Sequence, residues 1–510
     1  MRAVDGLKRV VIVGGGTAGW MTAAAFSKAL HGLPLSITLI ESDEIGTVGV
    51  GEATIPAIHH FNAFLGLNQA DFMRHCQATF KLGIEFINWG KVPGSYIHPF
   101  TRFGLDHTNL PFHQMWMAYA KDDLAAGRTT GIEAFSLACV AARKGLFAHP
   151  VSGAGSDITR LNYAFHFDAS LYARYLRSYA ETRGVTRVEG KIVDARQNVD
   201  TGFVTQVVLS DGRAVDGDFF IDCSGFRGLL IEQALKTGYE DWTHWLPADR
   251  AIAVPSDNGD RLLPLTQATT EAAGWRWSIP LQHRRGNGYV FSSQYLTEDA
   301  ARETLLQSLP AQPQAEPRTI RFVTGKRKAG WNRNVVAVGL SSGFLEPLES
   351  TSIHLIQAAI LRILAHFPDA EFSPADVAAY NRETSAEMER VRDFVILHYK
   401  TAGREDTSFW RYCRDMSVPD SLSHAIEAFK SRGRLTISHD NLFSVHSWLA
   451  VLLGQGILPS ALDPLLGTLP LSELNAVMAQ QRGEIDQALK GLRRHEDYLD
   501  AFCRAHRVNA

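Results

Sequence analysis

The sequence has few cysteines and no arrangement of them that would hold a metal ion or build a disulfide framework. Only five are present in 510 residues, and they are widely scattered. There is no C-x-x-C pair, and no histidines stand at zinc spacing. We therefore predict reduced thiols and no metal site. The five are Cys76, Cys139, Cys223, Cys413 and Cys503.

Long hydrophobic runs are also missing. A basic patch and an apolar run open the chain, as in a signal peptide, but the run stops at three glycines and is more typical of a strand. The most apolar late segment, 448–467, is interrupted by polar residues and two prolines, so it cannot cross a bilayer as one helix. We expect a soluble, cytoplasmic protein without a membrane partner.

Neither sign of charge is in large excess. The 51 Lys and Arg residues oppose 54 Asp and Glu residues, and the net charge of −3 provides no basic field for nucleic acid. Apolar residues make up 45% of the chain and charged residues 21%, so the chain is neither disordered nor fibrous and can bury a sizeable core. No internal repeat or low-complexity tract is visible, which excludes a solenoid.

A βαβ unit is present near the start of the chain. The strand Arg9–Val13, the helix Thr17–Leu30 and the strand Ser36–Ile40 follow one another. The G-x-G-x-x-G spacing of residues 14–19 would bring backbone N–H groups and a helix N-terminus to a pyrophosphate. Glu41 follows where a carboxylate that binds ribose hydroxyls is expected. Together these features predict a dinucleotide site, and a tight glycine turn with a surface glutamate is the alternative.

Two later strands indicate which dinucleotide is bound. Phe219–Ile221 runs into a small-residue turn that ends at Gly225, and Asn334–Val338 ends in the same way at Gly339. Two such turns after one early glycine loop suit an FAD that lies extended through the protein. A dehydrogenase would instead show a simpler doubly wound half. FAD is therefore favoured over NAD(P).

The rest of the chain divides into an α/β part and a helical part. Residues 62–119 are rich in aromatics and polar turns, which suggests helices and loops inserted into the nucleotide-binding layer. A hairpin turn is expected at Asp211-Gly212. The last third shows helical spacing and is expected to form an α-helical lobe. The expected strands are 185–188, 192–196 and 204–209, and the expected helices are 169–183, 350–365, 374–399 and 471–502.

Three further segments carry motifs in a fixed order. They are Gly49–Pro56 (GVGEATIP), Trp275–Pro280 (WRWSIP) and Pro347–Ser352 (PLESTS). These motifs resemble the signatures of the flavin-dependent tryptophan halogenase family, and with the glycine loop the resemblance covers almost the whole chain. It implies an α/β fold, in which an FAD-binding Rossmann-like module of the glutathione-reductase and hydroxybenzoate-hydroxylase type joins a mainly helical C-terminal substrate lobe. The expected domains are an FAD module at 1–350, with pocket segments inserted at about 60–165 and 240–325, and a substrate-binding lobe at 351–510.

The resemblance also implies the chemistry. The expected enzyme is an oxidoreductase that uses FADH2, O2 and bromide or chloride to form hypohalous acid, which reaches the substrate through an internal tunnel. The family's catalytic lysine matches Lys81, in the segment Phe80–Trp89. By itself, a lysine in this apolar setting is either a snorkelling side chain or a semi-buried donor. Glu349 matches a carboxylate that stabilises the cationic intermediate and helps to remove its proton, and the alternative for it is an acid at a helix start.

A halide site, a flavin wall and an FAD site are implied in the same way. The backbone amides of Thr351 and Ser352 match the halide site, although the family usually has glycine at position 352, and N–H groups at a helix N-terminus suit an anion. Trp275 and Trp277 match the tryptophans that wall the flavin and keep the substrate away from it. The residues expected to bind FAD are Gly14, Gly16, Thr17, Ala18, Gly19, Glu41, Val50, Ala53, Ile192, Gly339, Leu340 and Ile353.

The substrate pocket departs from the family's pattern. Tryptophan-specific members carry a Tyr-Tyr pair before an A/C-x-x-x-G-x-G stretch, and here Trp448 and Leu449 stand in its place. We therefore hypothesise that free tryptophan is a poor substrate and that indole or another small electron-rich aromatic is a better one. Bromination is expected to be at least as efficient as chlorination. The pocket candidates, for each of which core packing is an equally good explanation, are Phe103, His107, Phe112, His113, Trp116 and Trp448.

The sequence also leads to expectations about partners and about alternative functions. No nicotinamide site is evident, so the resemblance implies a separate NAD(P)H-dependent flavin reductase that supplies reduced FAD. A homodimer is allowed for. Two alternatives stay open: an FAD-dependent aromatic hydroxylase on the same fold, which would not need Lys81, and a non-catalytic flavin-binding protein, because a fold alone does not determine a function.

Overall fold

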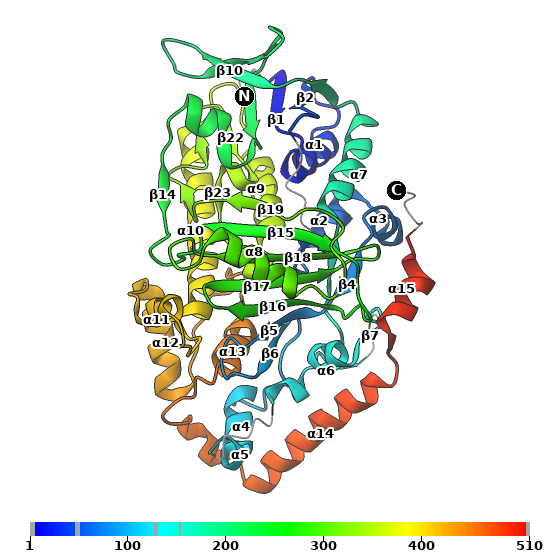
Figure 1. The fold of residues 1–510 in the computed structure, drawn as a ribbon, viewed down its shortest axis with the longest axis vertical. Coiled ribbons are helices and arrows are strands. Elements are labelled where there is room, and N and C mark those ends of the chain that lie inside the picture. Colours follow the sequence, from blue (N-terminus) through cyan, green and yellow to red (C-terminus); the bar gives the residue numbers. More distant parts are fainter. Residues whose placement is uncertain (1–5, 46–51, 126–130, 152, 154, 506–510) are drawn as a thin grey trace. The chain divides into compact units, whose positions relative to one another are not determined.

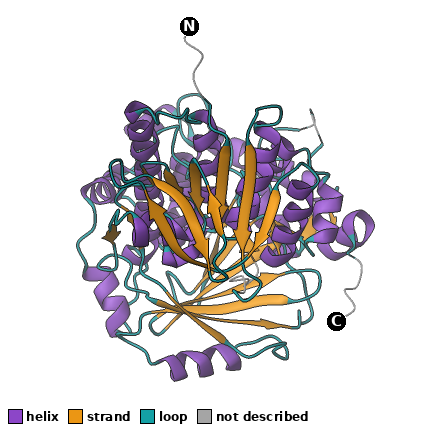
Figure 2. Cartoon of the chain, turned by 90° about the horizontal axis from the view of Figure 1, so that it is seen from above, coloured by secondary structure: helices purple, strands orange, loops and turns teal. Residues whose placement is uncertain are grey.

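The computed structural model describes residues 6–45, 52–125, 131–151, 153 and 155–505 (Figure 1). The chain forms two compact units, each built from three separate stretches, and both units combine sheets with helices (Figure 2). The first unit comprises Met1–Ala78, Phe167–Asp249 and Arg321–Glu389, and the second comprises Thr79–His166, Arg250–Ile320 and Arg390–Ala510. Within the described residues, no helix is long and apolar enough to cross a membrane.

A six-stranded sheet forms the centre of the first unit, in the order β21-β22-β13-β1-β2-β9. Its five strands from β22 to β9 are parallel, and only β21 runs antiparallel. The inner strands are almost entirely buried, as β-branched and aromatic runs predict. The strands are β1 (Arg9–Val13), β2 (Ser36–Glu41), β9 (Thr186–Glu189), β13 (Phe219–Asp222), β21 (Trp331–Asn332) and β22 (Val335–Ala337).

The predicted βαβ unit is confirmed. β1 and β2 are neighbours in parallel register, and the helix α1 (Thr17–Ala29) connects them. α1 packs against α7 (Ala169–Glu181), which begins where predicted because the Asp168 carboxylate accepts hydrogen bonds from the first-turn N–H groups of Ser170 and Leu171. The carboxyl ends of the parallel strands therefore meet at one edge, where ligands bind in folds of this kind.

A small antiparallel sheet adds to the core of the first unit. It consists of β10 (Ile192–Gln197), β11 (Val204–Leu209) and β12 (Ala214–Asp216), and the predicted turn at Asp211-Gly212 joins the last two strands. Ile192 is buried here in an apolar cluster with Val11 and Phe220. Although FAD binding was expected of Ile192, its described contacts are those of core packing.

A seven-stranded sheet forms the centre of the second unit, in the order β19-β15-β18-β17-β16-β5-β6. The expectation that residues 62–119 contain only helices and loops is wrong, because β4, β5 and β6 lie within them. β5 pairs with β16, which is about 180 residues away, so nothing in the local sequence marks the pairing. The strands of this sheet are β5 (Gly83–Ile87), β6 (Ser95–Pro99), β15 (Arg250–Ser256), β16 (Leu265–Glu271), β17 (Gly274–Pro280), β18 (Arg285–Phe291) and β19 (Arg318–Arg321). β4 (Thr79–Lys81) belongs to a separate, three-stranded sheet.

The last third of the chain is mainly helical, as predicted, but its last long helix is broken. The chain forms α14 (Leu471–Leu489), turns at Gly491, pairs β24 (Arg493–Arg494) with β7 (Leu146–Phe147), and ends in α15 (His495–Cys503). The prediction of one continuous helix over 471–502 is therefore wrong. The interruption depends on the distant β7, which helical periodicity cannot reveal.

The domain limits expected at residue 350 differ from the two units. α9 (Ser352–Ala365) packs against α1, so residues 351–389 belong to the first unit. α10 (Pro374–Lys400) follows. The remaining helices are α2 (Ile58–Leu65), α3 (Gln69–His75), α4 (Phe112–Tyr119), α5 (Lys121–Ala125), α6 (Leu137–Lys144), α8 (Glu298–Gln307), α11 (Ser408–Asp415), α12 (Asp420–Arg432) and α13 (Val445–Gly454), and the remaining strands are β3 (Glu52–Ala53), β8 (Ala164–Phe167), β14 (Tyr239–Asp241), β20 (Gly325–Arg327) and β23 (Gly343–Phe344).

Candidate active site

The glycine loop of the first unit is closely packed on one side and open on the other. Gly14 has a φ of 106°, and a Cβ there would lie 2.4 Å from the carbonyl oxygen of Cys223. A Cβ at Gly19 would lie 1.9 Å from the carbonyl oxygen of Gly14, whereas a Cβ at Gly16 would meet no atom within 4 Å. Only glycine therefore allows the first two contacts. The open side at Gly16 is where a bound group can approach the backbone.

The N-terminus of α1 is suited to bind an anion. Its first turn contains no acidic residue, and Gly16 supplies no side-chain cap. The first-turn N–H groups of a helix have no partner within the helix, so at α1 they can be satisfied by a phosphate. The predicted positions Gly14, Gly16, Thr17, Ala18 and Gly19 thus form one loop and helix start.

Glu41 lies at the end of β2, where the sequence places it. Its carboxylate accepts a hydrogen bond from Trp20 Nε1 at 3.2 Å and contacts the guanidinium groups of Arg177 and Arg187. A Cβ at Gly15 would lie 1.6 Å from the Glu41 carboxylate, so glycine is needed at that position as well. The carboxylate is fixed beside the loop and can accept hydrogen bonds from sugar hydroxyls.

β22, the last strand of the parallel sheet in the sequence, ends at the same edge of the sheet as the glycine loop. Gly339 has a φ of 75°, and a Cβ there would lie 2.9 Å from the Cβ of Ala18 and 3.6 Å from Ile356 on α9. The turn after β22, α1 and α9 therefore converge. Leu340 is half-buried in this turn, and Ile353 is buried in the first turn of α9. Ala53 is buried on β3, and Val50 lies outside the described residues.

Asp222 is a site-building residue that the sequence analysis missed. It is fully buried at the end of β13, and its carboxylate accepts hydrogen bonds from the N–H groups of Ser224, Leu230 and Ile231 at 2.8–3.0 Å. Ser341 donates its hydroxyl to the Asp222 carbonyl. One carboxylate therefore shapes the turn that contacts Gly14. An aspartate followed by a small-residue turn is the only sequence signal for this role.

Glu349 and its neighbours lie before α9. Glu349 is buried, and it ends a 3₁₀-helix at Pro347–Glu349. Ser350 adopts a left-handed conformation, with a φ of 58°, so α9 begins at Ser352 and not at the predicted Ser350. Glu349 is therefore separated from α9, at whose start the alternative interpretation placed it.

Three polar side-chain atoms of α9 and of the residue before it are buried. Thr351 Oγ1, His354 Nδ1 and Gln357 Nε2 are buried and have no hydrogen-bond partner among the described residues. An unpaired buried polar atom costs about 1–3 kcal/mol, so such atoms are usually satisfied by water or by a ligand. With the open loop at Gly16, these atoms make the first unit fit a large polar cofactor.

Lys81 is fully buried in the second unit. It therefore does not extend its ammonium group to solvent. Its Nζ lies 5.1 Å from the centre of the Phe100 ring, within the range of a cation–π contact. Burial lowers the pKa of His166, and the positive charge of Lys81 lowers it further.

Contacts of its neighbours hold the strand of Lys81 in place. Thr79 donates its hydroxyl to the carbonyl of Pro280 at 2.7 Å, and the N–H of Phe80 donates to Nε2 of His495 at 3.3 Å. The Phe80 ring stacks on Phe147 with 3.9 Å between centroids. Successive side chains of a strand point to opposite faces, so Lys81 projects away from the stacked rings.

An aromatic cluster, which the sequence analysis missed, contains His98, Phe394 and Trp448. His98 is buried on β6. Its ring centroid lies 5.8 Å from that of Phe394, which in turn lies 5.6 Å from that of Trp448. The structure thus places the predicted residue Trp448 against aromatics that were not predicted.

The aromatic candidates in α4 and in the segment before it are packed in the interior. Phe103 and Trp116 are almost fully buried. The Phe112 ring packs against Phe135, with 5.2 Å between centroids, and it occupies the space next to Gly104. These contacts attach α4 to the 3₁₀-helix at Ile132–Phe135.

The two histidine candidates have structural partners. His113 Nε2 lies 2.7 Å from the carbonyl oxygen of Gly433, and burial lowers the pKa of His113 despite this contact. His107 Nε2 lies 3.2 Å from a carboxylate oxygen of Glu473 on α14. Both contacts join segments that are far apart in the sequence.

Trp275 and Trp277 lie side by side on β17. Both are buried, and their ring centroids are 6.2 Å apart. A Cβ at Gly288 would lie 2.0 Å from the Trp277 ring, so this glycine makes room for the indole. Trp277 Nε1 is buried, and no described residue accepts a hydrogen bond from it. The pair can form a rigid wall.

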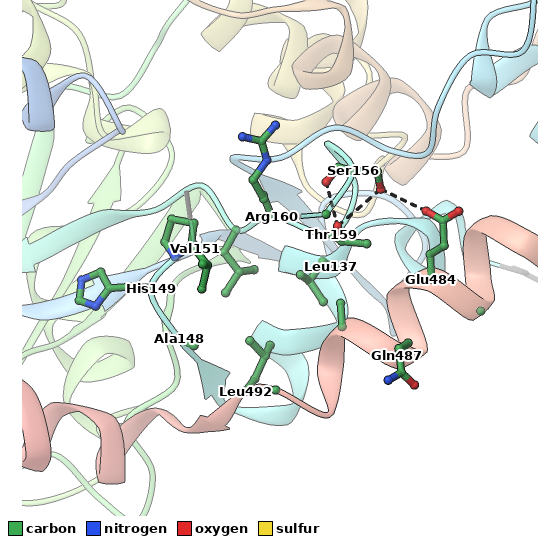
Figure 3. Close-up of a pocket in the computed structure, with 16 residues that line it drawn as sticks. Leu137, Ala148, His149, Val151, Ser156, Thr159, Arg160, Glu484, Gln487 and Leu492 are labelled. Atoms are coloured by element: carbon green, nitrogen blue, oxygen red, sulfur yellow. Dashed lines mark hydrogen bonds between the residues drawn. The ribbon is translucent and has the colours of Figure 1, made fainter. Parts of the chain in front are cut away.

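The second unit also contains a pocket of about 750 Å³ (Figure 3). Apolar side chains such as Leu137, Val151 and Leu492 line it, together with Arg160 and Glu484. His149 of this pocket contacts the Phe80 ring at 5.2 Å between centroids. The pocket therefore borders the face of β4 opposite to Lys81, and it is not the candidate reaction site. No cluster of three or more metal-ligating side chains occurs in the described part of the chain.

The chain is similar to known proteins along almost its whole length. The family model described as tryptophan halogenase matches residues 9–470. The solved structure of a flavin-dependent halogenase from Xanthomonas campestris is 45% identical, with a TM-score of 0.93, and covers 98% of this chain and 99% of its own. A flavin-dependent halogenase from Brevundimonas sp. BAL3 is 44% identical, with a TM-score of 0.93 and coverages of 97% and 99%. The curated tryptophan 7-halogenase of Lentzea aerocolonigenes is 36% identical over 91% of this chain and 92% of its own length.

Proposed function

Because the chain belongs to the tryptophan halogenase family and is a flavin-dependent halogenase, we propose that it halogenates a small electron-rich arene of the indole type, with Lys81 and Glu349 as its catalytic side chains. The observation that carries the proposal is the complete burial of Lys81 beside Phe100. A buried lysine in an aromatic setting is suited to hold a small reactive electrophile away from water.

The cofactor is FAD in its reduced form, and the residues of the first unit fit it. The pyrophosphate is assigned to the loop Gly14, Gly16, Thr17, Ala18 and Gly19, and a ribose to the fixed carboxylate of Glu41. Gly339, Leu340, Ile353 and Ala53 are assigned to the remainder, and the assignment of Val50 stays a prediction. When bound, reduced FAD supplies the electrons with which O2 oxidises halide to hypohalous acid. A separate flavin reductase delivers it, as flavin-dependent halogenases require.

In the proposed reaction, Lys81 donates a proton and Glu349 accepts one. The Lys81 ammonium donates a hydrogen bond to the oxygen of hypohalous acid and gives that oxygen a proton when the halogen–oxygen bond breaks. The arene ring forms the carbon–halogen bond, and the oxygen leaves as water. The Glu349 carboxylate then accepts the ring proton. Loss of a proton from Glu349 to solvent and uptake of a proton by Lys81 restore both groups, so one arene and one hypohalous acid give one haloarene and one water.

The remaining residues are assigned to binding the halide and to keeping the organic substrate away from the flavin. The backbone amides of Thr351 and Ser352 are assigned to the halide, and the unpaired Thr351 Oγ1 supports a polar ligand there. The paired rings of Trp275 and Trp277 are assigned to the flavin wall, which separates the organic substrate from the flavin. This separation distinguishes halogenation from hydroxylation.

The position of Trp448 supports the proposed substrate class. Its packing against Phe394, which leads to His98, supports an aromatic ring as the ligand. Trp448 and Leu449 occupy the place of the Tyr-Tyr clamp for the amino-acid group. Indole is therefore proposed as a better substrate than free tryptophan. Bromide is proposed to react at least as well as chloride, because it is easier to oxidise.

Mass spectrometry tests this proposal directly. Wild-type protein, FAD, a flavin reductase, NADH, O2 and bromide are incubated with indole or with tryptophan in parallel. We expect a bromine isotope doublet on indole and a weaker one on tryptophan. Strong tryptophan halogenation would refute the loss of the clamp, and oxygenated products without halogen would favour the hydroxylase. Absence of any halide-dependent product across an aromatic panel would favour a non-catalytic flavin-binding protein.

The cellular setting is also proposed. All five cysteines are buried and free, which supports a reducing cytoplasm. A homodimer is proposed as the assembly to test by light scattering.

A further inference from the structure

The two carboxylate oxygens of Glu41 have different surroundings. Oε1 accepts hydrogen bonds from Arg187 Nε at 2.5 Å and from Arg177 Nη1 at 3.4 Å. Oε2 accepts one hydrogen bond, from Trp20 Nε1 at 3.2 Å, and no other described residue donates to it. A carboxylate oxygen can accept two hydrogen bonds. Oε1 is therefore fully used, and Oε2 has one acceptor position left.

The oxygen with the remaining acceptor position is the one that lies over the glycine loop. A Cβ at Gly15 would lie 1.6 Å from Oε2 of Glu41, so Oε2 is nearer to the loop than Oε1 is. The donors to Oε1 come from α7 and β9, which carry Arg177 and Arg187. A nucleotide bound at the loop therefore reaches Glu41 through Oε2.

Trp20, the donor to Oε2, is held in place by its own surroundings. It is the fourth residue of α1, directly after Gly19, and it is only 2% exposed. The guanidinium group of Arg177 lies 5.9 Å from the centre of the Trp20 ring, within the range of a cation–π contact. A buried indole N–H needs an acceptor, and among the described residues this acceptor is Glu41. Trp20 and Glu41 therefore hold each other in one orientation.

We propose that Trp20 is a positioning residue for the nucleotide, which directs Oε2 of Glu41 to a sugar hydroxyl of the bound FAD while Arg177 and Arg187 hold Oε1. This inference rests on the proposed flavin site and deepens it. Without the indole N–H, the Glu41 side chain can adopt other rotamers. The selection of one rotamer on binding would then cost conformational entropy, and the Trp20 contact removes that cost in advance.

Competition against FAD isolates the sugar contact. ADP and its dideoxy analogue, which lacks both sugar hydroxyls, each displace FAD, and flavin fluorescence gives their affinities without turnover. One hydrogen bond to a charged group corresponds to about a tenfold change in affinity. We expect wild type to prefer ADP about tenfold, and Trp20→Phe, which keeps a ring without the N–H, to prefer it less than about threefold. In a Glu41→Ala background, which lacks the acceptor, Trp20→Phe should change the preference no further.

A matched control comes from another buried tryptophan of the first unit. Trp331 is 1% exposed and donates from Nε1 to the carbonyl of Arg333 at 2.8 Å, so Trp331→Phe also deletes one buried donor and should leave the preference for ADP unchanged. Thermal unfolding without FAD checks that each variant folds, and Trp20→Leu is a second variant without the donor that should lose the preference.

Three results would overturn the inference. They are a wild-type preference for ADP in Trp20→Phe or Trp20→Leu, an equal loss of the preference in Trp331→Phe, and a wild-type protein that binds FAD but does not distinguish ADP from its dideoxy analogue. If the wild-type protein itself binds no FAD, the proposed function fails as well.

Discussion

Acid should destabilise the protein through His495, which holds the strand of Lys81. His495 is 1% exposed at the start of α15. Its Nδ1 lies 2.7 Å from the carbonyl oxygen of Leu262, and its Nε2 accepts the N–H of Phe80 at 3.3 Å. Both contacts need the neutral ring with its hydrogen on Nδ1. A proton on Nε2 would remove the acceptor of Phe80.

The magnitude follows from the pKa of His495. Burial lowers this pKa from 6.5 to about 4, although the Leu262 carbonyl and Glu496 oppose the shift. The unfolded chain therefore takes up the proton first as pH falls. The stability that neutral His495 contributes is complete above pH 6.5 and is lost as pH falls from there toward 4. At about 1.4 kcal/mol per pKa unit, protonation of His495 alone lowers the free energy of unfolding by about 2 kcal/mol when the pH falls from 7.5 to 5.

His495→Gln isolates this effect. The glutamine carbonyl can accept the Phe80 N–H at the place of Nε2, and it does not titrate. Urea unfolding is followed for wild type and variant at pH 7.5 and pH 5. We expect the free energy of unfolding to fall by about 2 kcal/mol less in the variant, because the other titrating groups are common to both proteins. Equal losses in the two proteins would refute the reasoning.

Four further substitutions test other parts of the structure. Asp222→Ala removes the acceptor of buried backbone N–H groups and should cost about 2–5 kcal/mol of stability, measured by thermal unfolding. Gly14→Ala would place a Cβ 2.4 Å from a carbonyl oxygen, and it should abolish FAD binding in a fluorescence titration. Burial, with a smaller contribution from Asp168, raises the pKa of Glu52 to about 7, so the folded state loses stability as pH rises from 4.5 through 7; Glu52→Gln should therefore raise the melting temperature at pH 8 and not at pH 4. Phe100→Ala should lower kcat/KM for the arene about tenfold and leave FAD affinity unchanged.

The parts of the fold that the sequence predicted are those with local signals. The glycine loop, Glu41 and the strands on either side follow one another within about 35 residues, and the structure places them as expected. Local turn chemistry also predicted the hairpin at Asp211-Gly212, because only the residues of the turn itself matter.

The parts that the sequence could not predict depend on distant partners. β5 is a strand because β16 pairs with it, and the break before α15 exists because β7 pairs with β24. The aromatic cluster of His98, Phe394 and Trp448 joins positions that are almost 300 residues apart in the sequence. The identity of Lys81 was found only through the family's motif, since its burial is a property of the folded sheet.

The most direct test of the central claim compares wild type with Lys81→Met, which keeps the length of the side chain without its charge. Both proteins are supplied with reduced FAD, O2, bromide and indole, and bromoindole is measured by mass spectrometry together with the consumption of reduced FAD. We expect Lys81→Met to bind and consume reduced FAD like wild type and to form no bromoindole. Bromoindole formation at the wild-type rate in Lys81→Met would contradict the account.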